Sequence, residues 1–158
     1  MINNITKMIQ NEAAALDRHN VFVKNVTETG VVYALKNEDG YATSSSNELE
    51  GDDGEPVEMI CFWSDKALAQ SCIEEEWADY EVEALTVADF LENWCIGMSN
   101  EGVIAGTNFD SKMLGYEIEP LDLILEIIEA YIGLNKELPL KKFDDINDLE
   151  KQVRRIVE

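Results

Sequence analysis

The sequence predicts an α+β fold, in which a single domain packs helices against a mixed or mostly antiparallel β-sheet of about five to six strands. Three observations predict it. Short apolar runs of strand length, such as 58–63 and 103–109, alternate with segments whose apolar residues recur every three or four positions. The 158 residues suit one domain of ordinary size. A hydrophobic content of 46% supplies a core and is too high for an intrinsically disordered chain.

The chain begins with an amphipathic helix. Residues 2–18 place apolar side chains three and four positions apart, as one face of a helix requires. A further turn around 21–26 is expected to continue this helix until Gly30, a residue type that commonly ends helices.

A hairpin and a central strand follow. The segments 31–35 and 41–43 flank Asp39-Gly40, and this dipeptide tolerates the positive φ of a tight hairpin turn. Residues 44–56 are serine-rich, acidic and interrupted by glycine, which predicts an exposed acidic loop. The run 58–63 is apolar at nearly every position, so we expect a strand that is buried on both faces.

Two capped helices are predicted next. Ser64 or Asp65 is expected to cap a helix that continues to about Glu76, because a short side-chain oxygen accepts from the free amides of the first turn. Residues 81–85 alternate between acidic and apolar, which predicts a short strand. Thr86 then opens a second helix with an approximate capping box.

The remaining elements of the domain are two strands and a buried helix. Gly102 ends a helical turn, and the segments 103–109 and 115–119 are expected to be strands. Pro120 suits the first turn of a helix, where its missing N–H is not needed. The helix that follows, 121–132, is apolar around more than half of its circumference and should be deeply buried.

The C-terminal part has a different character. We expect the single α+β domain to cover residues 1–134, and residues 135–158 to form a linker with Pro139 and an amphipathic helix. Six of the twelve Lys and Arg residues lie in this part. This helix either folds back on the acidic region of its own chain or docks on another subunit.

Acidic residues give the chain its most unusual property. The 33 Asp and Glu residues outnumber the 12 Lys and Arg residues, so the formal net charge is -21. The stretch 38–89 holds sixteen carboxylates and one base, Lys66. Such a surface repels phosphate and anionic lipid and attracts basic partners. We therefore expect a basic protein partner, with no direct binding to nucleic acid or membranes, although acidic surface also serves solubility alone.

The sequence contains no recognisable catalytic, metal-binding or cofactor-binding motif. Three cysteines form neither an even set nor a C-x-x-C pair, so they are expected to be reduced and buried. The only histidine, His19, lies near the end of the first predicted helix and is expected at the surface, away from those thiols. Glycine-rich phosphate loops and a calcium-binding loop in the correct register do not occur. No catalytic residue, metal ligand or cofactor is therefore predicted.

The expected compartment is the cytoplasm. No apolar run approaches the length of a membrane span, and residues 1–11 lack the basic start and apolar stretch of a signal peptide. Cysteine usage also fits a reducing environment.

Several segments between Phe22 and Leu125 together resemble a bacterial domain family of unknown function. The matching residues are Val32-Tyr33-Ala34-Leu35, Asp39-Gly40-Tyr41, Phe62-Trp63-Ser64, Ala67, Ala69, Trp77-Ala78-Asp79-Tyr80 and Phe90-Leu91-Glu92-Asn93-Trp94. The part from Val103 to Phe109, with Gly115 and Pro120-Leu121-Asp122-Leu123, is also similar to the N-terminal domain of the SseB (enhanced serine sensitivity) family. Both resemblances imply an α+β sheet domain and neither implies an activity.

These features predict a non-catalytic, acidic protein-binding module, one version of which is an immunity or inhibitor protein against a basic toxin. An aromatic pair among the acids would receive Lys or Arg through cation–π contacts. The expected partner-binding residues are Glu48, Glu50, Asp52, Asp53, Glu55, Glu74, Glu75, Glu76, Trp77, Asp79 and Tyr80. The alternative is a small-ligand-binding protein or an enzyme with a pocket near Trp63 or Trp94. A third role is assembly of a homo-oligomer through the C-terminal helix.

Overall fold

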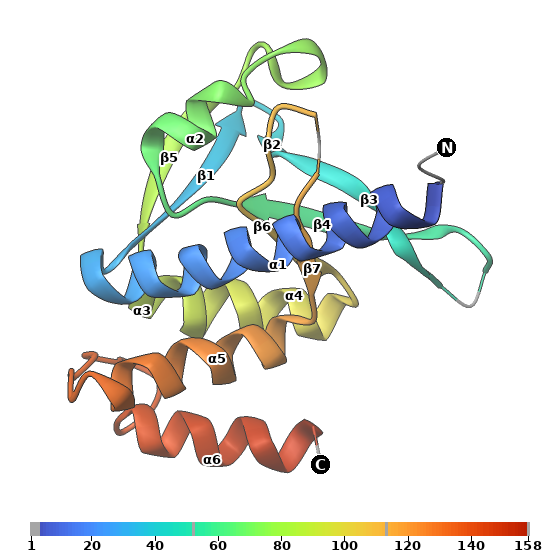
Figure 1. Cartoon of the computed structure of the whole chain (residues 1–158). Coiled ribbons are helices and arrows are strands. Elements are labelled where there is room, and N and C mark those ends of the chain that lie inside the picture. The colour runs from blue at the N-terminus through green and yellow to red at the C-terminus, as the bar shows by residue number, and fades with distance from the viewer. Residues whose placement is uncertain (1–3, 52, 113, 158) are drawn as a thin grey trace.

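The computed structural model confirms the α+β class, with helices packed around two connected sheets (Figure 1). It describes residues 4–51, 53–112 and 114–157, without the side chains of 4–11, 47, 48 and 76. The strands form a three-stranded sheet and a four-stranded sheet. The sequence predicted about five to six strands, and the additional one comes from a segment that was expected to be a loop.

The first helix, α1 (Asn4–Thr29), is continuous over 26 residues and joins the two helical segments that the sequence predicted. Gly30 ends it with a φ of 76°, a conformation that favours glycine. The inward face repeats every three or four residues, as a helix requires. Its buried members among the described side chains are Ala15, His19, Phe22, Val26 and Thr27.

The three-stranded sheet has β1 (Val31–Asn37) in the middle, between β2 (Gly40–Tyr41) and β5 (Glu81–Thr86), and is antiparallel throughout. The hairpin predicted around Asp39-Gly40 is confirmed. The side-chain oxygen of Asn37 accepts hydrogen bonds from the amides of Asp39 and Gly40, at 2.9 and 3.0 Å, and fixes the turn.

The segment expected to be the acidic loop 44–56 is largely a strand. Thr43–Glu50 forms β3, which is antiparallel to β4 (Pro56–Phe62) with an irregularity between Ser45 and Glu50. Its polar side chains gave no strand signal. An edge strand is nevertheless held by the backbone hydrogen bonds that its buried neighbour offers, and these need no apolar side chain.

The four-stranded sheet continues from β4 to β6 (Ile104–Thr107), which is parallel to it, and to β7 (Tyr116–Ile118), which is antiparallel to β6. The prediction that 58–63 is a central strand is confirmed, because β4 is paired on both edges. Its successive side chains enter two different hydrophobic clusters. Met59, Cys61 and Trp63 belong to one cluster, and Ile60 and Phe62 belong to the other.

Backbone contacts join the two sheets where β2 passes into β3. The amide of Ala42 donates to the carbonyl of Leu35 at 2.8 Å, and the amide of Cys61 donates to the carbonyl of Ala42 at 3.3 Å. Tyr33 and Trp63 form a further bridge, with two hydrogen bonds of 2.8 Å. The two sheets therefore form one connected unit.

Short helices follow β4 and β5, and both predicted caps are present. Asp65 accepts from the amides of Ala67 and Leu68 and begins α2 (Lys66–Ser71), which ends earlier than predicted and is followed by the 3-10 turn η1 (Glu75–Trp77). Thr86 accepts from the amide of Asp89. It begins a continuous helical stretch of α3 (Val87–Asp89), the π-helical η2 (Phe90–Cys95) and α4 (Ile96–Glu101), which ends at Gly102 with a φ of 73°.

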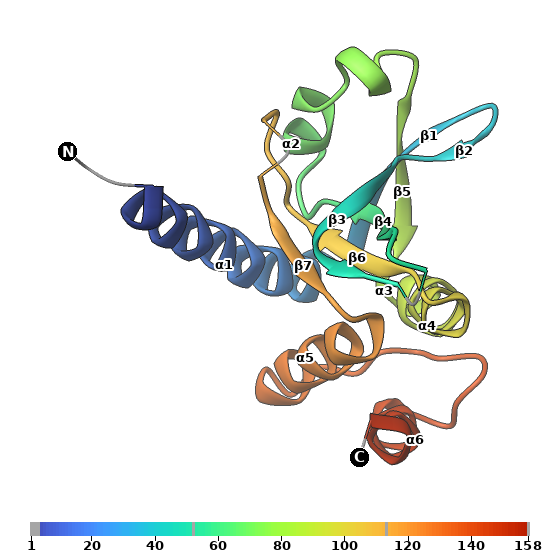
Figure 2. The ribbon, with the colours of Figure 1, turned by 90° about the vertical axis from the view of Figure 1, so that its right-hand side faces the viewer.

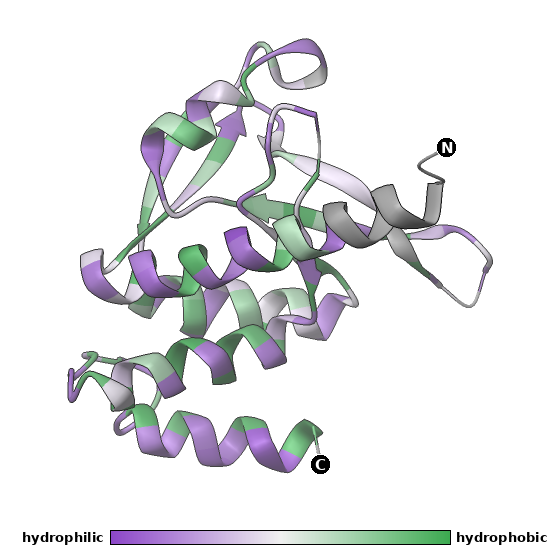
Figure 3. Cartoon of the chain, viewed as in Figure 1, coloured by the Kyte–Doolittle hydropathy of each residue, from purple (hydrophilic) through white to green (hydrophobic). Residues whose placement is uncertain are grey.

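The helix α5 (Pro120–Gly133) is largely buried, and the amphipathic C-terminal helix α6 (Ile146–Val157) folds back against it (Figures 1 and 3). Leu149 and Val153 of α6 are buried in the main cluster, and Arg154 forms an ion pair with Glu129 of α5 at 3.2 Å. The buried carboxylate of Glu92 accepts hydrogen bonds of 2.7 Å from the amides of Lys141 and Lys142, and these attach the linker to η2. The helix α6 thus folds back on its own chain, but it packs on α5 and not on the acidic stretch 38–89 as the sequence led us to expect.

Candidate functional site

A buried polar cluster lies at the carboxyl ends of the two parallel strands. Ser64 follows β4, and Thr107 and Asn108 end and follow β6. Asn108 is buried and has a φ of 48°, a left-handed conformation that asparagine tolerates better than most residues. Its side chain accepts from the amide of Ser64 at 2.9 Å and donates to the carbonyl of Arg18 at 3.1 Å. The strand ends are thereby attached to α1.

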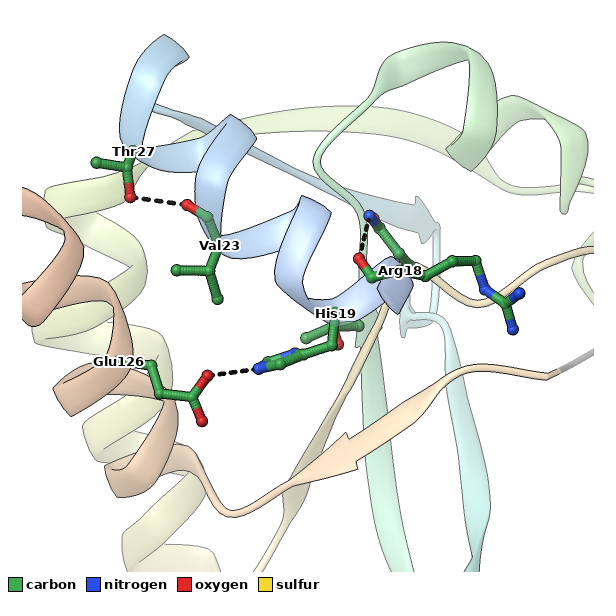
Figure 4. A network of polar contacts seen from close by, with 7 residues as sticks. Arg18, His19, Val23, Thr27 and Glu126 are labelled. Atoms are coloured by element: carbon green, nitrogen blue, oxygen red, sulfur yellow. Dashed lines mark hydrogen bonds and ion pairs between the residues drawn. The ribbon is translucent and has the colours of Figure 1, made fainter. Parts of the chain in front are cut away.

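His19 extends this cluster toward α5. Its Nδ1 lies 2.7 Å from the hydroxyl of Thr107, and its Nε2 lies 2.6 Å from Oε1 of Glu126. Figure 4 shows the imidazole on α1 pointing at the carboxylate on α5. Only 1% of the His19 side chain is exposed, against 41% of the Glu126 side chain. One buried ring therefore connects α1, β6 and α5, and holds a carboxylate that reaches the surface.

The expectation that His19 lies at the surface was wrong. The reason is its place on the apolar stripe of α1, four residues after Ala15 and three before Phe22, where a helical side chain faces the core. A buried imidazole needs partners at both nitrogens, and Thr107 and Glu126 supply them. The ring of Tyr116 stacks on it, with the centroids 4.4 Å apart.

The order hydroxyl, imidazole, carboxylate is that of a nucleophile, a base and an orienting group. Thr107 has no exposed surface, however, so its hydroxyl is out of reach of a substrate in this conformation. The thiols offer no alternative, because burial raises the pKa of Cys61, Cys72 and Cys95 and keeps them protonated. The prediction that the cysteines are buried is confirmed. The cluster is best described as a structural connection that positions Glu126.

Glu126 lines a groove of about 560 Å³ between α1 and α5. Most of the surface that lines this groove is apolar, and Val23, Ala130 and Leu134 contribute to it. Leu134 is 55% exposed, a large fraction for a leucine. Of the groups in the groove, the Glu126 carboxylate is the one that the buried His19 holds.

A second concave feature is an acidic cleft of about 580 Å³ at the end of the three-stranded sheet. It lies between the β1–β2 turn and the beginning of β5. The strands β1 and β5 pair so that Lys36 is opposite Glu81 and Ala34 is opposite Glu83. Four carboxylates and one ammonium group line it. The lining residues are Lys36, Asn37, Glu38, Asp79, Glu81, Val82 and Glu83.

Hydrogen bonds and charge give this acidic cleft a defined shape. Asn37 donates to the carboxylate of Asp79 at 3.3 Å, which ties the turn to the segment before β5. Lys36 lies 3.9 Å from one oxygen of Glu83, and the other oxygen, Oε2, is a buried atom without a hydrogen-bond partner among the described residues. Burial, together with the negative charges of Glu83 and Asp89, raises the pKa of Tyr41 to about 12.

The predicted partner-binding residues fall in two separate places. Glu50, Asp53 and Glu55 are exposed at the tip of the β3–β4 hairpin, whereas Glu74, Glu75 and Asp79 are exposed in the connection between α2 and β5. Figures 1 and 2 show the hairpin tip and this connection well apart. The described partner-binding residues therefore lie on two surfaces and do not form one acidic face. Asp52 and the side chains of Glu48 and Glu76 lie outside the described residues.

The aromatic side chains expected at the binding surface lie in or against the core. Trp77 is 5% exposed and packs edge-on against Trp63, with the ring centroids 6.0 Å apart, so its face is not free for a cation. Tyr80 is half-buried against the same cluster. Trp63 has no exposed surface and donates its indole N–H to the carbonyl of Phe109 at 2.8 Å. Trp94 lines a small hollow of about 250 Å³.

Asp79 is the one predicted partner-binding residue that lines the acidic cleft, and it lies there with Glu38, Glu81 and Glu83, which were not among the residues named above. Their charge was evident in the sequence, where Glu81 and Glu83 alternate with apolar residues. The pairing of β1 with β5 places Glu81 and Glu83 beside the β1–β2 turn, which carries Glu38. No local sequence pattern encodes that pairing. His19 had a local signal, because it continues the apolar stripe of the first helix.

Two features are absent from the described part of the chain: a metal-binding cluster and a membrane-spanning helix. No group of three or more His, Cys, Asp and Glu side chains there is arranged to hold a metal ion. Within the same residues, no helix combines the length and apolar character needed to cross a bilayer.

The fold and these features define an α+β domain that combines an acidic cleft with a buried histidine connection. The chain belongs to the family described as "Protein of unknown function (DUF2750)", which it matches over residues 19–127. The resemblance to a domain family of unknown function is thereby confirmed, whereas the resemblance to the SseB family stays a prediction. The matched range begins at His19 and includes Glu126. Neither a curated protein nor a solved structure gives a significant match.

Proposed function

We propose that the protein is a non-catalytic module that binds a basic protein partner through the acidic cleft. The observation that carries the proposal is that Glu38, Asp79, Glu81 and Glu83 line one cleft of about 580 Å³ with Lys36 as its base. A Lys or Arg side chain of a partner supplies the charge and the N–H donors that these carboxylates accept.

The net charge of -21 supports the same kind of partner. A strongly acidic surface speeds the encounter with a basic protein, and the acidic cleft would then fix the orientation of the complex. Exposed ion pairs contribute only about 0.2–1 kcal/mol each. Stable binding therefore requires several of the four carboxylates to act together, preferably with an arginine, whose planar guanidinium contacts two oxygens at once.

An immunity or inhibitor protein is one version of this proposal. In that version the carboxylates of the acidic cleft occupy the positions at which a basic toxin, such as a nuclease, binds phosphate. The alternative proposal, a small-ligand-binding protein or enzyme with a pocket near Trp63 or Trp94, has less support, because Trp63 is buried and the hollow at Trp94 measures only about 250 Å³.

The test is a charge-neutral replacement at the acidic cleft. The triple variant Glu38→Gln, Asp79→Asn, Glu81→Gln changes three exposed side chains and keeps their size. Binding of a hexa-arginine peptide is measured by calorimetry at about 20 mM and about 300 mM NaCl, a range over which screening increases strongly. We expect the variant to bind at least tenfold more weakly than the wild type at low salt.

The matched control moves the same charge change to the hairpin tip. The triple variant Glu50→Gln, Asp53→Asn, Glu55→Gln also changes three exposed acids and adds the same charge. We expect it to lose no more than about twofold in affinity, the size of a weak long-range effect. Equal losses in both triple variants would show a general effect of net charge and would refute the acidic cleft as the site.

A further inference from the structure

We infer that the groove between α1 and α5 is a second, independent binding site, and that it takes a small apolar molecule that carries an amine. The inference does not depend on the acidic cleft. It rests on the size and lining of the groove, on the position of Glu126, and on the lack of a Lys or Arg partner for Glu126 among the described residues.

The groove has the size and the surface of a small-molecule site. Ligand sites in proteins are commonly about 300–1,000 Å³, mostly apolar, and carry a few placed polar groups. This groove measures about 560 Å³, and Val23, Ala130, Gly133 and Leu134 are among the residues that line it. A β-carbon added at Gly133 would meet nothing within 4 Å, so the space beside this residue is open.

One carboxylate in the groove is held in a fixed place. Oε1 of Glu126 accepts from Nε2 of the buried His19 at 2.6 Å, and the ring is itself fixed by Thr107 at 2.7 Å. An orienting partner of this kind limits the motion of a binding group before the ligand arrives. The side chain is still 41% exposed, which leaves the carboxylate accessible to an ammonium donor from the groove.

The carboxylate of Glu126 favours a cation over an anion in the groove. Glu28, Glu126 and Glu129 line it against one base, Lys24. Arg154 neutralises Glu129 in an ion pair of 3.2 Å, and Lys136, whose ammonium donates to the carbonyl of Thr27 at 2.6 Å, keeps its positive charge near Glu28. Glu126 has no Lys or Arg partner among the described residues, so an incoming amine would supply one.

Three probes with the same six-carbon chain separate the contribution of the amine from that of the apolar chain. Hexylamine, 1-hexanol and hexanoate are titrated into the full-length protein up to about 20 mM, and backbone amide shifts are followed by NMR; weak, millimolar binding is the range expected for ligands of this size. We expect hexylamine to shift the amides of Val23, Thr27 and Ala130 in a saturable way. Hexanol should bind at least fivefold more weakly, and hexanoate should not bind there.

Two variants test the site and should fold. Glu126→Gln keeps an oxygen that accepts from His19 but removes the charge, and we expect hexylamine affinity to fall at least tenfold with hexanol unchanged. Gly133→Leu places a side chain in the open space and improves helix propensity, and we expect it to weaken both probes. The controls are Glu137→Gln, an exposed acid outside the groove, and Gly97→Leu, a helical glycine of α4 that also has open space around it.

Several results would overturn the inference. Hexanol binding as tightly as hexylamine, or hexanoate binding more tightly, would show that the groove does not select an amine. Unchanged hexylamine affinity in Glu126→Gln or Gly133→Leu would place the amine elsewhere. We expect the acidic-cleft variant to lose hexa-arginine binding and to keep hexylamine binding. The acidic cleft and the groove are therefore tested by different measurements, and either proposal can fail without the other.

Discussion

Replacing His19 by leucine tests whether the buried imidazole holds three elements together. The change removes both hydrogen bonds, at 2.7 Å to Thr107 and at 2.6 Å to Glu126, together with the stacking on Tyr116. Leucine fills most of the space, so a large cavity is not the main effect. We expect the free energy of unfolding to fall by about 1.5–4.5 kcal/mol.

The magnitude follows from what is left behind. The Thr107 hydroxyl is fully buried and would lose the partner that His19 gives it, which costs about 1–3 kcal/mol. Loss of the ring contact with Tyr116 adds about 0.5–1.5 kcal/mol. Glu126 contributes little, because its side chain is 41% exposed and water replaces the lost donor.

The assay is urea unfolding followed by tryptophan fluorescence, with Thr107→Val and the double variant measured beside it. The double variant His19→Leu, Thr107→Val removes the imidazole and the hydroxyl together, so neither is left buried without its partner. Its loss of unfolding free energy should be at least about 1 kcal/mol smaller than the sum of the losses in the two single variants. Asn20→Ala, an exposed neighbour on α1, is the control and should change stability by less than about 0.5 kcal/mol. Additive effects, or a loss below about 0.5 kcal/mol for His19→Leu, would refute the connection.

Four further outcomes are expected. Gly115→Ala would place a β-carbon 2.1 Å from the buried ring of Phe109 and should cost about 2 kcal/mol or more, whereas Gly133→Ala, with open space around it, should be neutral or stabilising in the same urea experiment. The three buried thiols should react with a disulfide reagent at pH 8 only after unfolding, because burial raises their pKa; reaction in the native protein would contradict this. Burial raises the pKa of Tyr41 from 10.0 to about 12. Its contribution to stability is therefore complete below pH 10 and is lost as the pH rises to about 12. Ultraviolet titration of the wild type and of Tyr41→Phe measures the pKa of this tyrosine. Deleting residues 143–158 uncovers the apolar face of α5 and should lower the melting temperature and increase binding of a hydrophobic dye, with light scattering reporting any change in assembly.

Local patterns were sufficient for most helices and for the strands with a strong apolar signal. The caps at Asp65 and Thr86, the turn at Asp39-Gly40 and the central strand β4 each depend on a few neighbouring residues, and each is present. The strand β3 was missed because its side chains are polar and its pairing partner supplies the stability. Edge strands of this type carry no local apolar signal.

His19 shows the opposite kind of error. Its spacing from Ala15, Phe22 and Val26 placed it on the buried stripe of α1, but its polarity was given more weight than its position. A polar residue in an apolar stripe requires buried partners, and Thr107 and Glu126 lie 88 and 107 positions away in the chain. Spacing therefore indicated that the residue is buried, whereas its partners could come only from the tertiary structure.

The acidic cleft depends on tertiary pairing for the same reason. Glu38 and Glu81 are brought together because β1 and β5 pair antiparallel, with Lys36 opposite Glu81, although the strands are more than forty residues apart. Other carboxylates of equal charge are placed at the hairpin tip, far from this site. The amount of acidic charge is thus a property of the sequence, whereas its concentration in one concave place is a property of the fold. A partner that recognises the acidic cleft must therefore distinguish two triple variants of identical net charge.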